Sequence, residues 1–247
     1  MPKQKTINKT LTFSGLKLEQ AIFEVRSYNR GHLPAVVADF WDTVEKTLEV
    51  SIVYGFQEAA SVARLGKSLE LSVASDRFSV IQFFPSKDLK EYFHTAAKVF
   101  SAYIDHLRTE NIARVGFRLI YSMDFDDPMS VAKQFLQLPY VSVPDGLTLA
   151  ESGRPVIPTY SVGYNDGQKA MVYRLMGNTG KLSVDLPPIL AHTSDYPETI
   201  EKIYNQFVFD VDVFTSAPLL TGELIVIEWL EQAYDAVRTD GVKFFGK

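Results

Sequence analysis

The sequence predicts an α+β fold in which a mainly antiparallel sheet packs against long amphipathic helices. Segments of strict period-two alternation occur in both halves of the chain, and tight-turn sequences join several of them, as is typical of antiparallel neighbours. Two long segments instead repeat apolar residues every three or four positions, which is helical spacing. Because helical and strand segments do not alternate regularly, a doubly wound parallel sheet is not expected.

Composition sets the class of protein. The 247 residues are 46% hydrophobic and 13% aromatic, which is too apolar for a disordered chain. Cysteine is absent, so disulfides, thiolate catalysis and cysteine-ligated metals are excluded. The net charge of −5 and the scattered basic residues argue against nucleic acid and anionic membranes as partners. The sequence has neither a signal peptide nor an apolar run of about 18 residues, so we expect a cytoplasmic protein without a membrane span.

The first half, residues 1–127, begins with a strand in which Ala21, Phe23 and Val25 alternate with polar residues. A helix follows up to Leu48, with Pro34 in its first turn. The further elements expected here are strands at 50–54, 68–73 and 78–84, a turn at Ser75-Asp76-Arg77, a long helix over 86–110 with Ser86 as its N-cap, and a strand over 112–125.

The second half, residues 128–247, follows the turn sequence Asp126-Asp127-Pro128. Its expected elements are a helix at 129–138, a loop at 139–158, a hairpin at 159–176 turning at Asn165-Asp166-Gly167, an irregular stretch at 177–198, a strand at 207–214 and a helix at 220–237. Both halves contain a hairpin, a return strand and a long amphipathic helix. The sequence therefore predicts two loosely similar α+β halves, which form either two units or one continuous domain.

Charged side chains recur on one face of three predicted strands. Residues two apart in a strand point to the same side, which pairs Asp210 with Asp212, Arg114 with Arg118, and Glu24 with Arg26. All six occupy positions opposite the apolar face of their strand. We expect them to form one network in which at least one arginine bridges to a carboxylate. A structural or binding network is favoured over a catalytic one, because nucleophile and general-base candidates are missing.

Other signatures of chemistry are absent or incomplete. The four histidines do not have the spacing of a metal site, and no cofactor is expected. The segment from Gly177 to Ser183 has too short a gap between its glycines for a phosphate loop, and we interpret it as a β-turn. Near the C-terminus, Phe244 and Phe245 are adjacent. Such a pair packs either in its own domain or on another chain, so both residues are interface candidates.

Three motifs together resemble a known family. They are Glu19-Gln-Ala-Ile-Phe-Glu-Val-Arg26, Ala113-Arg-Val-Gly-Phe-Arg-Leu-Ile120, and Phe209-Asp-Val-Asp-Val-Phe214 followed by a C-terminal helix. Their order and spacing, from about Leu16 to Phe245, resemble a sporadically distributed, uncharacterised family of bacterial proteins of about 250 residues. The family's middle strand runs R-x-G-x-R-Φ-x-N, where Φ is apolar or aromatic; here Tyr121 or Ser122 takes the place of the asparagine. The resemblance implies a patchy bacterial distribution, as in phage-defence or toxin–antitoxin loci, and implies no activity.

Three function classes follow. The first is a non-enzymatic interaction or regulatory subunit of a bacterial complex, which holds another protein chain as a homo-oligomer or a hetero-complex. The second is a small-molecule sensor in which the sheet grips the long helix around an apolar pocket. The third is an enzyme that uses Glu24, Arg118, Asp210 and Asp212. Composition and motifs favour the first, since no catalytic residues can be assigned.

Overall fold

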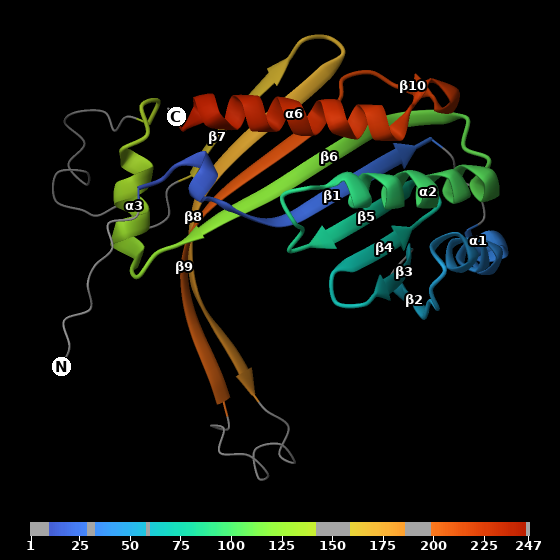
Figure 1. The fold of residues 1–247 in the computed structure, drawn as a ribbon, viewed down its shortest axis with the longest axis horizontal. Helices are drawn as coiled ribbons and strands as arrows, with labels where there is room; N and C mark the ends of the chain where they lie inside the picture. Colours follow the sequence, from blue (N-terminus) through green and yellow to red (C-terminus); the bar gives the residue numbers. More distant parts are fainter. Residues whose placement is uncertain (1–9, 29–32, 58–59, 142–158, 186–198, 246–247) are drawn as a thin grey trace.

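The computed structural model describes residues 10–28, 33–57, 60–141, 159–185 and 199–245. In these ranges ten strands form one antiparallel sheet, and four α-helices pack on it (Figure 1). The predicted α+β class with an antiparallel sheet is therefore confirmed. None of the helices in this part of the chain has an apolar stretch long enough to cross a bilayer.

The sheet has the strand order β2-β3-β4-β5-β1-β6-β9-β8-β7, and β10 pairs with β6. The strands are β1 (Lys17–Ser27), β2 (Tyr54–Gln57), β3 (Ala60–Leu65), β4 (Leu69–Val73), β5 (Arg77–Phe83), β6 (Asn111–Asp124), β7 (Thr159–Asn165), β8 (Lys169–Asp185), β9 (Thr199–Thr215) and β10 (Leu219–Leu220). The helices are α1 (Leu33–Leu48), α2 (Lys90–Leu107), α3 (Pro128–Leu136) and α6 (Val226–Phe244). Because β6 pairs directly with β9, a single sheet runs across the expected boundary at residue 127.

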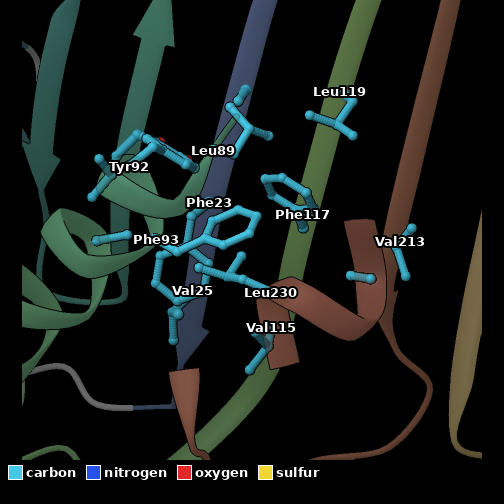
Figure 2. Close-up of a cluster of buried hydrophobic side chains, with 14 of the residues drawn as sticks. Phe23, Val25, Leu89, Tyr92, Phe93, Val115, Phe117, Leu119, Val213 and Leu230 are labelled. Atoms are coloured by element: carbon cyan, nitrogen blue, oxygen red, sulfur yellow. The ribbon is translucent and has the colours of Figure 1, made fainter. Parts of the chain in front are cut away.

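The hydrophobic core lies between one face of the sheet and helices α2 and α6. Phe23 on β1, Phe117 on β6 and Val213 on β9 are fully buried and alternate with more exposed positions, so period two directs them all to this face. Phe93 of α2 and Leu230 of α6 close over them (Figure 2). The opposite face, which we call the open face, carries the charged residues of these strands together with half-buried apolar ones such as Ile22 and Phe214. The other two described helices also lie on the core side, where Phe135 of α3 contacts Phe207 and the Trp41 indole of α1 donates to Ser61.

Two helix boundaries differ from the sequence prediction. Helix α2 begins at Lys90, and Ser86 does not cap it: the Ser86 hydroxyl donates to the Asp88 carbonyl, while the Asp88 carboxylate accepts from the Lys90 N–H. Helix α6 covers Val226–Phe244 rather than 220–237. It starts later because Leu219 and Leu220 pair with β6 as β10, and a 3₁₀ turn follows. Tertiary pairing with β6 thus overrides the local helical pattern.

Three strand assignments differ from the sequence prediction. The strand expected at 50–54 lies further along the chain, as β2 at Tyr54–Gln57, and shares only Tyr54 with the expected range. Strand β3, rich in small residues, was not predicted. The predicted turn at Gly177–Ser183 is wrong, because β8 continues unbroken to Asp185 in register with β9. The ring of Tyr204 lies across Gly180, where a Cβ would be 2.4 Å from the Tyr204 hydroxyl oxygen. The remainder of the predicted irregular stretch, 186–198, and most of the predicted loop, 142–158, lie outside the described residues.

The far ends of β8 and β9 leave the body of the sheet as a two-stranded ribbon (Figure 1). Strand β6 pairs with β9 only as far as Gln206, and β7 pairs with β8 only as far as Met176. Beyond these points Gly180–Asp185 pairs with Thr199–Tyr204. We call this ribbon the β8–β9 arm; at about 3.3 Å per residue it extends roughly 20 Å.

Candidate functional site

The six charged residues singled out in the sequence lie together on the open face. Glu24 and Arg26 are on β1, Arg114 and Arg118 are on β6, and Asp210 and Asp212 are on β9, the three neighbouring strands at the centre of the sheet. Each of the six takes part in an ion pair, with at least one arginine bridging to a carboxylate, but the pairs form two separate groups rather than the expected single network: Arg26, Glu24, Arg114 and Asp212 in one, Arg118 and Asp210 in the other. Together with Arg174 of β8 they make up what we call the charged row.

Asp210 is the most buried member of the charged row. Its side chain is 1% exposed, yet it accepts hydrogen bonds from Arg118 Nε to Oδ1 and from Arg118 Nη2 to Oδ2, both at 2.7 Å. Arg174 Nη1 lies 3.3 Å from Oδ2 on the other side. The hydrogen bonds to Asp210 raise the pKa of Arg118 above its ordinary value. Two arginines are thus anchored on one buried carboxylate, while their own side chains remain 43% and 36% exposed.

Arg114 joins the second half of the charged row. Its Nη2 donates to Asp212 Oδ2 at 2.8 Å, and its Nη1 lies 3.4 Å from Glu24 Oε1, which also accepts from Arg26 Nε at 2.7 Å. The guanidinium also lies 4.4 Å from the centre of the Phe214 ring. Burial raises the pKa of the Asp212 carboxyl above its ordinary value, and Arg114 is the largest influence opposing that rise. Arg114 therefore offsets part of the cost of burying the Asp212 carboxylate.

Gly116 makes the position of Arg114 possible. A Cβ built on Gly116 would lie 2.7 Å from Arg114 Nη1, which is closer than real contacts allow. Across the strand pair Gly116 faces Phe214, whose ring supports the guanidinium. In the R-x-G-x-R segment, Gly116 has no side chain, and the space this leaves lets the Arg114 side chain reach β9.

Arg174 is the member that the sequence analysis missed. It stands directly opposite Asp210 in the β8–β9 register. The face on which Arg174 lies follows from its neighbours in the strand, because Tyr173 and Leu175 on either side are buried in the core while Arg174 is not. With Arg174 included, the charged row contains four arginines and three carboxylates.

The arrangement is suited to holding and presenting guanidinium groups rather than to proton transfer. Both oxygens of Asp210 accept from arginine, and Glu24 and Asp212 are paired as well, so no carboxylate in the charged row stands ready as a general base. Within the described ranges, no group of three or more His, Cys, Asp or Glu residues could hold a metal ion. The exposed edges of Arg26, Arg118 and Arg174 are the groups left to meet another molecule.

The interface candidates Phe244 and Phe245 lie in an aromatic cluster of their own domain. The Phe244 ring is 4.5 Å from that of Tyr140 and 4.9 Å from that of Tyr173. The Phe245 ring meets the buried Phe209 edge-on at 5.0 Å. Both rings are half-buried, so they dock the end of α6 onto the sheet.

Neither the comparison with models of protein families nor the comparison with curated proteins finds a match to this chain.

Proposed function

We propose that this protein is a non-enzymatic interaction protein that holds another polypeptide on the open face of its sheet, and that this polypeptide is a second copy of the same chain. The observation that carries the proposal is the sequence of charges across the charged row. Passing from β1 through β6 and β9 to β8, the strands carry Glu24, Arg118, Asp210 and Arg174. Apart from Arg26, which pairs with Glu24 on β1 itself, the signs therefore alternate strand by strand.

Such a row complements itself under two-fold symmetry. A two-fold axis parallel to the strands, placed above the boundary of β6 and β9, sets β6 of one copy over β9 of its partner and β1 over β8. Each positive strand then faces a negative one, which is the self-complementary pattern that an isologous interface needs. Two sheets packed face to face are also a common arrangement in β proteins.

The open face offers apolar area between the charges. Half-buried aliphatic and aromatic side chains surround the charged row, namely Ile22, Ile81, Ile120, Val172, Val208 and Phe214. With the axis at this place, β5, β1, β6, β9, β8 and β7 of each copy overlap. At about 4.8 Å between strands and about 3.3 Å per residue, seven residues per strand cover roughly 700 Å² per copy, close to the roughly 800 Å² of a standard interface.

Light scattering over a concentration series tests the proposal. The wild type is expected to approach twice the chain mass of 27.8 kDa as concentration rises. In this arrangement β8 lies over the partner's β1, so Arg174→Glu replaces the positive charge of β8 by a negative one above that strand and should weaken association at least tenfold. Circular dichroism and thermal unfolding of each variant confirm that it remains folded, with Arg174→Ala as the milder change.

Arg64→Glu is the matched control. Arg64 lies on β3, is 74% exposed and pairs with Glu70, but β3 lies outside the overlapping strands. Its reversal should leave association within about twofold of the wild type. A protein that stays monomeric at all concentrations, or one that Arg64→Glu and Arg174→Glu affect equally, would rule out the second copy as the occupant of the open face.

A further inference from the structure

An aromatic groove lies on the opposite side of the sheet from the charged row, between α6 and the β7–β8 hairpin. It has a volume of about 680 Å³, within the range of sites for small organic ligands. Tyr140, Tyr160, Tyr173 and Phe244 line its walls, and Ala233 and Ala236 of α6 line it from the helix. Alanines at these two positions leave open a space that larger side chains would fill. We call this space the α6 groove.

The aromatic rings along the α6 groove contact one another. Tyr140 lies 5.1 Å from Tyr160 and 4.5 Å from Phe244, centre to centre, and Phe244 stacks on Tyr173 at 4.9 Å. A continuous aromatic wall of this kind favours a flat apolar ligand. The groove lining includes Gln232 and Asp240, eight residues apart on α6, which corresponds to about 12 Å of helix. The shape therefore favours an elongated molecule.

The charges of the α6 groove are already satisfied. Its lining contains two aspartates and two lysines. Asp166 accepts from the backbone N–H groups of Gln168 and Lys169, and the Lys169 ammonium donates to Gln232. At the other end Asp240 accepts from the Tyr173 hydroxyl at 3.0 Å, and the Lys243 ammonium lies 3.5 Å from it. The lining has no net charge and no carboxylate without a donor, so it favours an uncharged ligand.

One polar group of the lining lacks a partner. The Tyr140 hydroxyl is buried and makes no hydrogen bond within the described part of the chain. Burial raises the pKa of Tyr140, so the hydroxyl keeps its proton at neutral pH and can donate it. A buried hydroxyl without a partner is costly; because this oxygen has no accessible surface, a ligand acceptor satisfies it once the Tyr140 ring turns toward the groove.

We propose that the α6 groove is a binding site for an uncharged, elongated aromatic molecule that offers a hydrogen-bond acceptor to the Tyr140 hydroxyl. The site does not depend on the open face, because the sheet separates the two. A ligand there would contact both α6 and β7, the last helix and the edge strand, and would join them directly.

Nile red is a suitable probe, since it is uncharged, elongated and planar and has a carbonyl acceptor. Fluorescence titration of the full chain should show saturable binding with blue-shifted emission. Ala236→Trp fills the α6 groove and should weaken binding at least tenfold. Tyr140→Phe removes only the hydroxyl and should weaken it about fivefold, the equivalent of one neutral hydrogen bond. Thr239→Trp is the matched control, because Thr239 is exposed on α6 and is not part of the lining; it should change the affinity less than twofold.

Two results would overturn the proposal. One is binding that is absent, or that is equally strong in Ala236→Trp and Thr239→Trp. The other is tighter binding of the cationic dye thioflavin T than of Nile red, which would show that the ligand class is wrong. If Ala236→Trp does not fold, amide hydrogen exchange of the wild type decides: Nile red must slow exchange in β7 and in the second half of α6 while leaving β3 and β4 unchanged.

Discussion

Arg118 binds Asp210 diagonally across the sheet rather than the residue that faces it. Its register partner on β9 is Asp212, whereas Asp210 faces Ile120, yet Arg118 Nε and Nη2 each lie 2.7 Å from an oxygen of Asp210. This diagonal leaves Asp212 to Arg114, which reaches it from the other side. Each of the two arginines on β6 thus forms an ion pair with a different aspartate on β9.

Removing Arg118 should destabilise the protein. In Arg118→Ala the buried Asp210 carboxylate keeps only the longer contact with Arg174. We expect a loss of about 2 kcal/mol, below the roughly 3–5 kcal/mol of a fully buried pair because Arg118 is 43% exposed. For a domain of this size that corresponds to a fall in Tm of roughly 4–8 °C by calorimetry. Arg26→Ala, which removes an arginine 51% exposed, should cost less than about 1 kcal/mol. An equal cost for both changes would contradict the anchoring role of Arg118.

Replacing Gly116 by alanine should lower the stability of the protein only when Arg114 is present. Gly116→Ala should cost about 1–2 kcal/mol, since the added methyl displaces the Arg114 guanidinium from Asp212. In an Arg114→Ala background the same change should be nearly neutral, so a double-mutant cycle by urea denaturation isolates the coupling. Gly163→Ala on β7 is the control, because its nearest neighbour would be at an ordinary 3.6 Å. Additivity of Gly116→Ala and Arg114→Ala would show that the glycine has another role.

Alkaline pH should unfold the protein through its buried tyrosines. The Tyr92 hydroxyl donates to the Val80 carbonyl, and burial raises its pKa above the ordinary value of 10. A folded-state pKa above the unfolded value means that the stabilisation is complete below about pH 10 and is lost as the pH rises further. One such tyrosine adds about 1.4 kcal/mol per pH unit to the fall in the free energy of unfolding.

Urea denaturation between about pH 9 and pH 11 measures this slope. Tyr92→Phe should make it shallower, whereas Tyr28→Phe, at a side chain 64% exposed, should not. An identical slope in the wild type and Tyr92→Phe would refute the assignment.

Phe245 should matter for the stability of the single chain. Phe245→Ala removes the ring that meets Phe209 at 5.0 Å and Phe207 at 6.0 Å, and should cost about 2 kcal/mol for a half-buried aromatic. The fall in Tm should be the same at low and high protein concentration. Val242→Ala, at a neighbouring residue 46% exposed, serves as the control and should have little effect. A Tm loss that appears only at high concentration would assign Phe245 to contact with another chain instead.

The sequence predicted the charged row because period-two alternation determines which face a strand residue occupies. The same alternation could not reveal the diagonal pairing of Arg118, which depends on strand register. Arg174 was missed because it is the lone charge of its phase in β8, where Ala170, Val172 and Met176 are apolar. The late start of α6 could not be predicted either, because β10 exists only through its pairing with β6. The α6 groove arises from α6 packing beside β8, an arrangement that single residues do not encode.

The self-paired β8–β9 arm allows the chain to vary in length at little cost to the rest of the fold. Gly180–Asp185 pairs with Thr199–Tyr204 and not with the strands of the sheet body, so residues can be lost or gained there without altering the register of β6 and β9. The change must occur in matched numbers on both strands to keep their pairing. Matched insertions and deletions would lengthen or shorten the ribbon while the core and the charged row stay in place.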